Sequence, residues 1–166
     1  DQAIVAQIVA GEPVGLNRLL SRHGHLLAEY VRALVGDDDE RFAMVYEDVL
    51  VDALRSMRSI SGRNGVLRRA LLESAARTIR KRYADILHMT AEPRGATPQI
   101  SELESIESAS EEQLRTALAA MTPAERELLV LRYRFGFNYA DISDIIREAR
   151  VQLEAVSYTH LRAHET

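Results

Sequence analysis

Apolar residues recur every three or four positions along almost the whole chain, and this spacing constrains the fold more than any other feature of the sequence. The pattern begins with Ile4, Val5, Ile8 and Val9 and continues as a second stripe over residues 16–34. Because an α-helix turns once in about 3.6 residues, side chains with this spacing line one inward face. No stretch alternates with a period of two for long enough to indicate a β-strand. The sequence therefore predicts an all-α protein.

Glycine, proline and capping residues mark the ends of the predicted helices. A Gly-Glu-Pro run at residues 11–13 separates the first two helices, and a third and a fourth are predicted over residues 40–57 and 66–87. Later in the chain, TPAE at residues 122–125 has the form of a capping box, and Asn138 can cap the helix that follows. The residues expected to face inward there are Leu128, Leu129, Leu131, Tyr133, Ala140, Ile142, Ile145 and Ile146.

Charge is segregated along the chain, although the formal net charge is only −4. Residues 63–82 hold seven bases and one acid, whereas residues 84–112 hold seven acids and one base. A basic helix is typical of a surface that faces a polyanion, and an acidic stretch with Pro, Gly and Ser is typical of a linker. The predicted organisation is a helical domain over residues 1–89, a flexible linker over 90–110, a small helical domain over 111–155 and a non-native tail over 156–166.

Three segments of the sequence together resemble one known family. The longest is LAAMTPAERELLVLRYRFGFNYADISDII at residues 118–146, and the others are YEDVLVDAL at 46–54 and LLESAARTIRKRY at 71–83. They resemble region four, the acidic helix of region two and the promoter-melting helix of the extracytoplasmic-function (ECF) group of bacterial sigma-70 factors. The resemblance implies a four-helix region-two module, a linker and a small region-four module. It also implies core RNA polymerase and promoter DNA as partners, with an anti-sigma protein as a further candidate.

The acidic helix supplies the candidate polymerase-binding residues, which are Glu47, Asp48, Val51 and Asp52. The resemblance implies that a carboxylate stripe on this helix faces basic residues of the polymerase clamp. The alternative interpretation is a charged helix face that meets only solvent.

The basic helix supplies most of the candidate DNA-binding residues, because its cations can neutralise phosphates and release counterions. The resemblance implies that this helix and the preceding loop hold unpaired bases of the −10 element. The chain has no Trp, Ala70 stands where the family usually has an aromatic residue, and Thr78 stands where Asn is common. Base stacking must therefore come from elsewhere, and a charged surface helix is the alternative interpretation. The candidates are Arg68, Arg69, Arg77, Thr78, Arg80, Lys81, Arg82 and, in the second domain, Tyr139.

The helix beginning at Tyr139 resembles the first helix of a helix-turn-helix but lacks the expected continuation. After Ile146 the sequence runs on through charged residues without the turn and the basic recognition helix of the family. Residues 111–155 hold six bases and eight acids, a net charge of −2 that is unfavourable for gripping DNA. We therefore expect an incomplete helix-turn-helix and impaired reading of the −35 element. An intact locus is expected to encode a turn and a basic helix after Ile146.

The terminal sequence VSYTHLRAHET, residues 156–166, breaks the helical pattern and resembles a transposase sequencing adapter read as protein. We interpret it as a scar. His160 and His164 imitate part of a metal site, but within a scar they predict none. Because the chain begins at Asp1 instead of Met, its true N-terminus is expected to lie upstream.

The remaining observations exclude several function classes. The chain has no Cys, which excludes disulfides and thiolate nucleophiles, and it has no apolar run long enough to span a bilayer. No phosphate-binding glycine loop or catalytic motif occurs. We expect a cytoplasmic protein that is not an enzyme and uses no cofactor. The alternative function is a sigma-like helical adaptor that binds polymerase or an anti-sigma protein without reading DNA.

Overall fold

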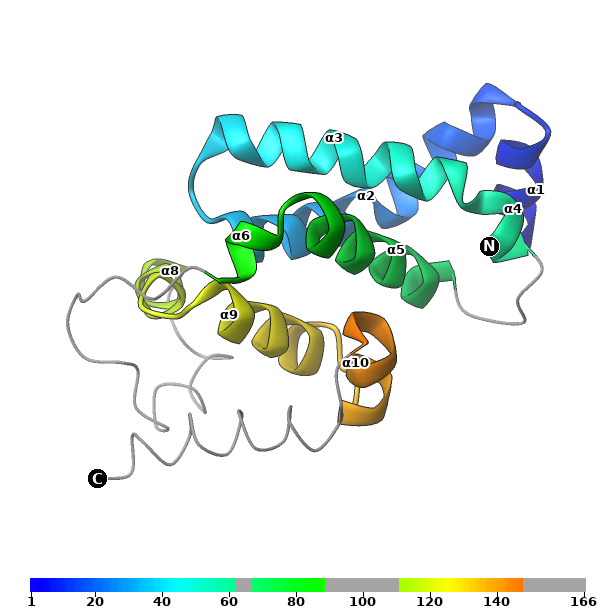
Figure 1. Ribbon diagram of the computed structural model, residues 1–166. Helices are drawn as coiled ribbons and strands as arrows, with labels where there is room; N and C mark the ends of the chain where they lie inside the picture. The colour runs from blue at the N-terminus through cyan, green and yellow to red at the C-terminus, as the bar shows by residue number, and fades with distance from the viewer. Residues whose placement is uncertain (62–66, 89–110, 148–166) are drawn as a thin grey trace. The chain divides into compact units, whose positions relative to one another are not determined.

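The computed structural model describes residues 1–61, 67–88 and 111–147 (Figure 1). These residues form helices and turns, with no strand in the part of the chain that is described, which confirms the predicted all-α fold. The chain divides into two compact units, Asp1–Ala84 and Asp85–Thr166. The predicted linker and the adapter-like tail lie outside the described residues.

The first unit is a bundle in which a long central helix contacts most of the others. Helix α2 packs against α1, α3 and α5, and the short α4 packs against α1 and α3. Helices α3 and α5 run side by side in opposite directions (Figure 1). The helices are α1 Gln2–Val9, α2 Pro13–Val35, α3 Asp39–Arg55, α4 Met57–Ser61 and α5 Leu67–Arg82.

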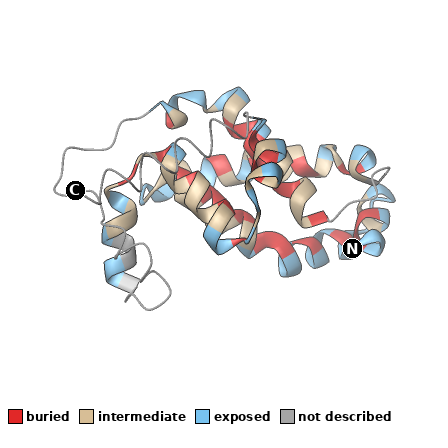
Figure 2. Ribbon diagram, turned by 90° about the horizontal axis from the view of Figure 1, so that it is seen from below, coloured by how far each residue is buried: buried red, intermediate tan, exposed pale blue. Residues whose placement is uncertain are grey.

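The core of this unit is built from the apolar stripes that the sequence predicts. Buried positions follow the three- and four-residue spacing along the long helices, with exposed positions on their other sides (Figure 2). This burial removes apolar surface from water and is the main term that holds the helices together. The fully buried side chains include Leu27, Tyr30, Val31 and Leu34 of α2, Val45, Val49 and Ala53 of α3, and Leu71, Ala75 and Ile79 of α5.

Two of the predicted helices are each divided in the structure. The helix predicted over residues 40–57 ends at Arg55, with Ser56 as its C-cap, and α4 begins at Met57. The Ser56 hydroxyl also donates to the Asp52 carbonyl oxygen at 2.8 Å. The helix predicted over residues 66–87 is interrupted at Tyr83, which separates α5 from the short α6, Ala84–Leu87. The first unit therefore contains α1 to α5 among its described residues, rather than the four helices predicted.

The second unit contains α8 Glu111–Ala119, α9 Pro123–Leu129, a short π-helix η1 Val130–Arg134 and α10 Tyr139–Ile146. Its predicted caps are confirmed. The Thr122 hydroxyl accepts from the Glu125 backbone N–H at 3.1 Å, and the Glu125 carboxylate accepts from the Thr122 N–H at 3.4 Å. The Asn138 side-chain oxygen accepts from the Asp141 N–H at 2.8 Å and so begins α10. These bonds satisfy amide groups that the helices leave without internal partners.

Burial in the second unit follows the prediction only in part. Leu131, Ile142, Ile145 and Ile146 are buried as predicted and Leu128 and Leu129 are half-buried, but Ala140 is exposed and Tyr133 is 62% exposed. The physical reason at Tyr133 is η1, in which the N–H of Phe135 bonds to the carbonyl of Val130, five residues back, at 2.9 Å. A π-turn is wider than the α-turn that the prediction assumed. Leu131 stays buried as predicted, and Phe135 takes the buried position instead of Tyr133.

Two glycines of α2 differ in how closely neighbouring atoms approach them. A β-carbon added at Gly15 would lie 2.8 Å from the Ile8 backbone nitrogen, whereas one added at Gly24 would meet nothing closer than the Tyr46 hydroxyl at 3.4 Å. Alanine is favoured over glycine in a helix by about 1 kcal/mol. We expect Gly24→Ala to maintain or raise the free energy of unfolding and Gly15→Ala to lower it by about 1–3 kcal/mol through overpacking against α1.

The measurement is urea unfolding followed by circular dichroism. The two variants change the same residue type in the same helix, so each is the control for the other. Equal stability of the two variants would contradict the close approach of α1 and α2 at Gly15.

Candidate functional site

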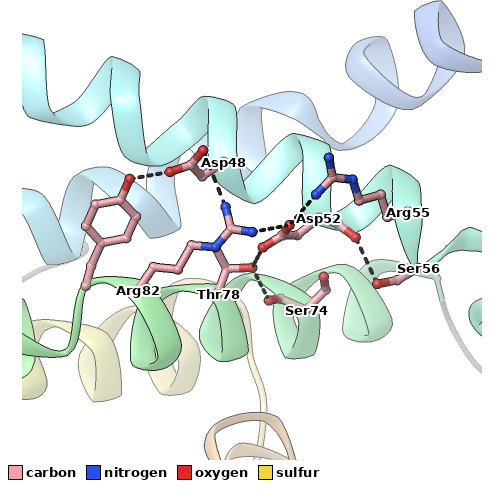
Figure 3. Close-up of polar contacts among 8 residues, drawn as sticks. Asp48, Asp52, Arg55, Ser56, Ser74, Thr78 and Arg82 are labelled. Carbon is pink, nitrogen blue, oxygen red and sulfur yellow. Dashed lines mark hydrogen bonds and ion pairs between the residues drawn. The ribbon is translucent and has the colours of Figure 1, made fainter.

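The four candidate polymerase-binding residues lie on α3 but differ in exposure. Glu47 is exposed, while Asp48, Val51 and Asp52 are half-buried. Asp48 and Asp52 are one helical turn apart, and both side chains project from α3 toward α5 (Figure 3). Only Glu47 among the predicted acids therefore presents its carboxylate fully to solvent.

The Asp52 carboxylate is held from α5 through both of its oxygens. Its Oδ2 accepts from the Thr78 hydroxyl at 2.9 Å, and its Oδ1 accepts from the Arg82 guanidinium at 3.3 Å (Figure 3). Arg55 of the same helix approaches Oδ1 at 4.0 Å. Charge-assisted hydrogen bonds of this kind are the stronger class in proteins, so Asp52 is a link between α3 and α5.

The Asp48 carboxylate is held in the same way, one turn earlier on α3. Its Oδ1 lies 3.6 Å from Nη1 of Arg82, and its Oδ2 accepts from the Tyr83 phenol. The guanidinium of Arg82 thus lies between the two carboxylates. All four carboxylate oxygens of the pair contact donors from the last turns of α5 and the residue after it.

Thr78 belongs to this helix–helix contact, because it is only 4% exposed. Its hydroxyl lies 2.9 Å from Asp52 Oδ2 and 3.0 Å from the Ser74 carbonyl oxygen. A hydroxyl has one proton and donates to one acceptor at a time, and the charged carboxylate is the stronger acceptor. The residue predicted to hold DNA bases therefore faces α3.

The cations of the predicted DNA-binding helix fall into two groups. Arg77 and Lys81 are exposed and lie one turn apart on the same side of α5. The others contact the protein or are half-buried. Arg69 pairs with Glu73 at 3.3 Å, Arg80 donates to the Ala76 carbonyl at 3.4 Å, Arg82 pairs with Asp48 and Asp52, and Arg68 is half-buried.

Tyr83 was not among the predicted site residues, although it contacts Asp48. The hydrogen bond to the Asp48 carboxylate raises the pKa of the Tyr83 phenol to about 12, and burial and the negative charge of Asp48 act in the same direction. The phenol therefore stays protonated and donates at neutral pH. Its position directly after a basic helix gave no sequence signal, because its partner lies 35 residues earlier.

Met44 is a second residue that the sequence interpretation missed. It precedes Glu47 by one helical turn on α3 and is 52% exposed, which is unusual for a large apolar side chain. Its spacing from Glu47 could have indicated a shared outward face.

In the second unit, the candidate Tyr139 is the first residue of α10 and is half-buried. The Arg132 guanidinium lies over its ring at 5.2 Å from the centroid and donates to the Phe137 carbonyl at 3.2 Å. This cation–π contact and the Asn138 cap fix the beginning of α10.

The end of α10 corrects one expectation. The sequence was expected to run on after Ile146 without a turn, but α10 ends there and Arg147 adopts the left-handed conformation with φ 60° and ψ 38°. A left-handed residue is a common helix terminator, usually Gly, and at another residue it costs about 1–2 kcal/mol. Helix α10 thus ends in a left-handed residue that is not glycine. Residues 148–155, which bear on the predicted missing helix, lie outside the described residues.

Within residues 1–61, 67–88 and 111–147, no group of three or more His, Asp or Glu side chains could hold a metal ion. In that same part of the chain, no helix combines the length and apolar character needed to cross a bilayer. His160 and His164 lie outside the described residues.

Comparison with known families gives one match. Residues 111–147 match the family model described as Sigma-70, region 4, and the match takes in α8, α9, η1 and α10. The search of curated proteins found no match. The second unit is therefore similar to region 4 of sigma-70 factors, as the resemblance of residues 118–146 indicated.

The contact between Asp48 and Tyr83 predicts a stability change at alkaline pH. The pKa of the folded Tyr83 phenol, about 12, exceeds the unfolded value of about 10. The hydrogen bond therefore contributes stability that is fully present below about pH 10 and is lost as the pH rises through about 12. Asp48→Asn removes the charged acceptor. The free energy of unfolding of this variant should therefore lie below that of wild type, and the difference should decrease as the pH rises from about 10 to about 12.

The measurement is the free energy of urea unfolding of wild type and the Asp48→Asn variant at several pH values up to about 12. Tyr83→Phe is the control, since it removes the titrating group, and its deficit should narrow in the same window. A deficit that is independent of pH for both variants would rule out the contact.

Proposed function

We propose that the chain is a sigma factor of the ECF group, which directs RNA polymerase to promoters. The observation that supports this best is the similarity of residues 111–147 to region 4 of the sigma-70 family. The region-two-like segments of the first unit extend the resemblance beyond that match. In this proposal the protein acts in the cytoplasm by binding, with no catalytic step of its own.

The proposed polymerase surface is the outward side of α3. Glu47 offers an exposed carboxylate, and Met44, together with half-buried Val51, offers apolar area beside it. Methionine and other flexible apolar residues are frequent in the centre of protein interfaces, with charges at the rim. Asp48 and Asp52 add negative charge next to this surface but are not its outward residues, because their carboxylate oxygens contact α5.

The proposed nucleic-acid surface of the first unit is the exposed side of α5. Arg77 and Lys81 are one turn apart and meet solvent, so each can contact a phosphate. In the second unit, Tyr139 stands at the N-terminus of α10, where a helix-turn-helix meets the DNA backbone. Thr78 is left out of the proposed set, since it is buried.

A second candidate function is an adaptor that binds polymerase or an anti-sigma protein without reading DNA. The observation that favours it is the net charge of −2 over residues 111–155, where recognition of a −35 element needs a basic surface. If the chain is instead a sigma factor, the same net charge predicts weak recognition of the −35 element.

The polymerase surface is tested with a matched pair of neutral substitutions. Glu47→Gln should weaken binding of the full chain to core RNA polymerase by about fivefold, because an exposed ion pair contributes up to about 1 kcal/mol. Glu12→Gln is the control, since Glu12 is also exposed but stands at the start of α2. Binding is measured by fluorescence titration at two salt concentrations. An equal effect of the two substitutions would remove Glu47 from the interface.

The nucleic-acid surface is tested by the salt dependence of binding to duplex DNA. Arg77→Gln and Lys81→Gln should each lower the slope of log affinity against log salt by about 0.9, as expected for one lost phosphate contact. Arg18→Gln, at an exposed arginine of α2, is the control and should leave the slope unchanged. A slope unaffected by either α5 substitution would exclude this face from DNA binding.

Transcription separates the two candidate functions. Core polymerase with the chain is assayed for run-off transcripts from promoter libraries. Promoter-specific transcripts favour the sigma factor, whereas tight polymerase binding without any specific transcript favours the adaptor.

A further inference from the structure

The proposed surfaces leave one group of contacts unexplained, namely the carboxylate pair held by α5. Arg82 lies between Asp48 and Asp52, with nitrogen–oxygen distances of 3.6 and 3.3 Å. We propose that Arg82 is a positioning residue for the acidic surface of α3, rather than a nucleic-acid contact. This inference rests on the proposed function, because it gives Arg82 a part in binding polymerase.

Asp48 and Asp52 are like charges at positions i and i+4 of one helix, an arrangement that is destabilising by itself. A single guanidinium between them offsets this repulsion. Its planar, forked geometry allows two nitrogens to address two carboxylates at once, which a lysine ammonium does not match.

Every carboxylate oxygen of the pair has a donor. Thr78 and Tyr83 hold the outer oxygens, Asp52 Oδ2 and Asp48 Oδ2, while Arg82 takes the two Oδ1 atoms (Figure 3). Without Arg82, Asp48 Oδ1 loses this cation and Asp52 Oδ1 keeps only the more distant Arg55, at 4.0 Å, so the two side chains regain rotamer freedom. Ordering such side chains again on binding a partner lowers affinity.

The Arg82 side chain is 42% exposed and those of Asp48 and Asp52 are 33% and 22% exposed, so solvent screens these ion pairs. Pairs of this kind contribute little to the stability of a fold. The packing of α3 against α5 depends instead on buried apolar residues, and the fold is expected to survive loss of the guanidinium.

Lys81, the next residue, gives the contrast. It is exposed and lies one turn from Arg77, whereas Arg82 is directed to the acids of α3. Adjacent residues on a helix point about 100° apart, so two neighbouring cations serve different surfaces. A comparison of the two side chains therefore isolates the role of Arg82.

The experiment compares Arg82→Met, Arg82→Lys and Lys81→Met in the full chain, with melting curves to verify folding. Arg82→Met should weaken binding to core polymerase by about three- to fivefold while largely sparing the salt slope for duplex DNA. Lys81→Met should lower the salt slope for duplex DNA while largely sparing binding to core polymerase. Arg82→Lys should fall between wild type and Arg82→Met, since an ammonium reaches one carboxylate at a time.

The sign of the polymerase effect separates positioning from net charge. If only charge mattered, Arg82→Met would make α3 more acidic and strengthen binding to a basic polymerase surface. Binding as tight as wild type or tighter would therefore overturn the proposal, and so would a loss of DNA salt slope equal to that of Lys81→Met.

A double-mutant cycle between Arg82→Met and Asp52→Asn in urea unfolding provides a readout without polymerase. Because solvent screens the pair, the expected coupling is favourable but small; a measurable coupling supports the contact, and strictly additive effects overturn it. If the proposed function is wrong, wild type itself does not bind core polymerase, and Arg82 has no role in that binding. The coupling between Arg82 and Asp52 in the double-mutant cycle is then still observed.

Discussion

The contacts that α5 makes with two carboxylates of α3 determine which charged side chains of these two helices pair with each other and which face solvent. Asp48 and Asp52 contact Thr78, Arg82 and Tyr83, so one threonine and one arginine of a basic helix are directed toward α3. Of the predicted site residues, Glu47 on α3 and Arg77 and Lys81 on α5 remain exposed without being directed to the other helix. Asp39, Glu40 and Arg55 of α3 are exposed as well.

In the proposed function, these exposed side chains give one small bundle two surfaces of opposite charge. A basic helix and an acidic helix packed together attract each other, and part of their charge is used in that attraction. The proposed surfaces are the Glu47 carboxylate beside Met44 on α3 and the two cations Arg77 and Lys81, one turn apart on α5. The buried apolar stripes keep the two helices in register, so neither surface depends on the ion pairs for its fold.

The second unit shows the same division between local and non-local effects. Caps at Thr122 and Asn138 begin two helices, and both could be predicted because each involves a residue only three positions away. The π-helix at residues 130–134 was not predictable from apolar spacing, and it turns Tyr133 to solvent. The left-handed Arg147 was likewise missed, since no glycine or proline announces it.

The sequence by itself determined the helical character, most helix positions, the caps and the apolar stripes, because these follow from contacts within about one turn of a helix. It also contained the similarity to region 4 that the comparison found. Only the tertiary structure decided which charged side chains pair across α3 and α5 and which face solvent. Thr78 lies 26 residues from Asp52, and Tyr83 lies 35 residues from Asp48, so their pairing depends on how α3 and α5 pack. A charge on a helix can be counted from the sequence, but its partner is set by the neighbouring helix.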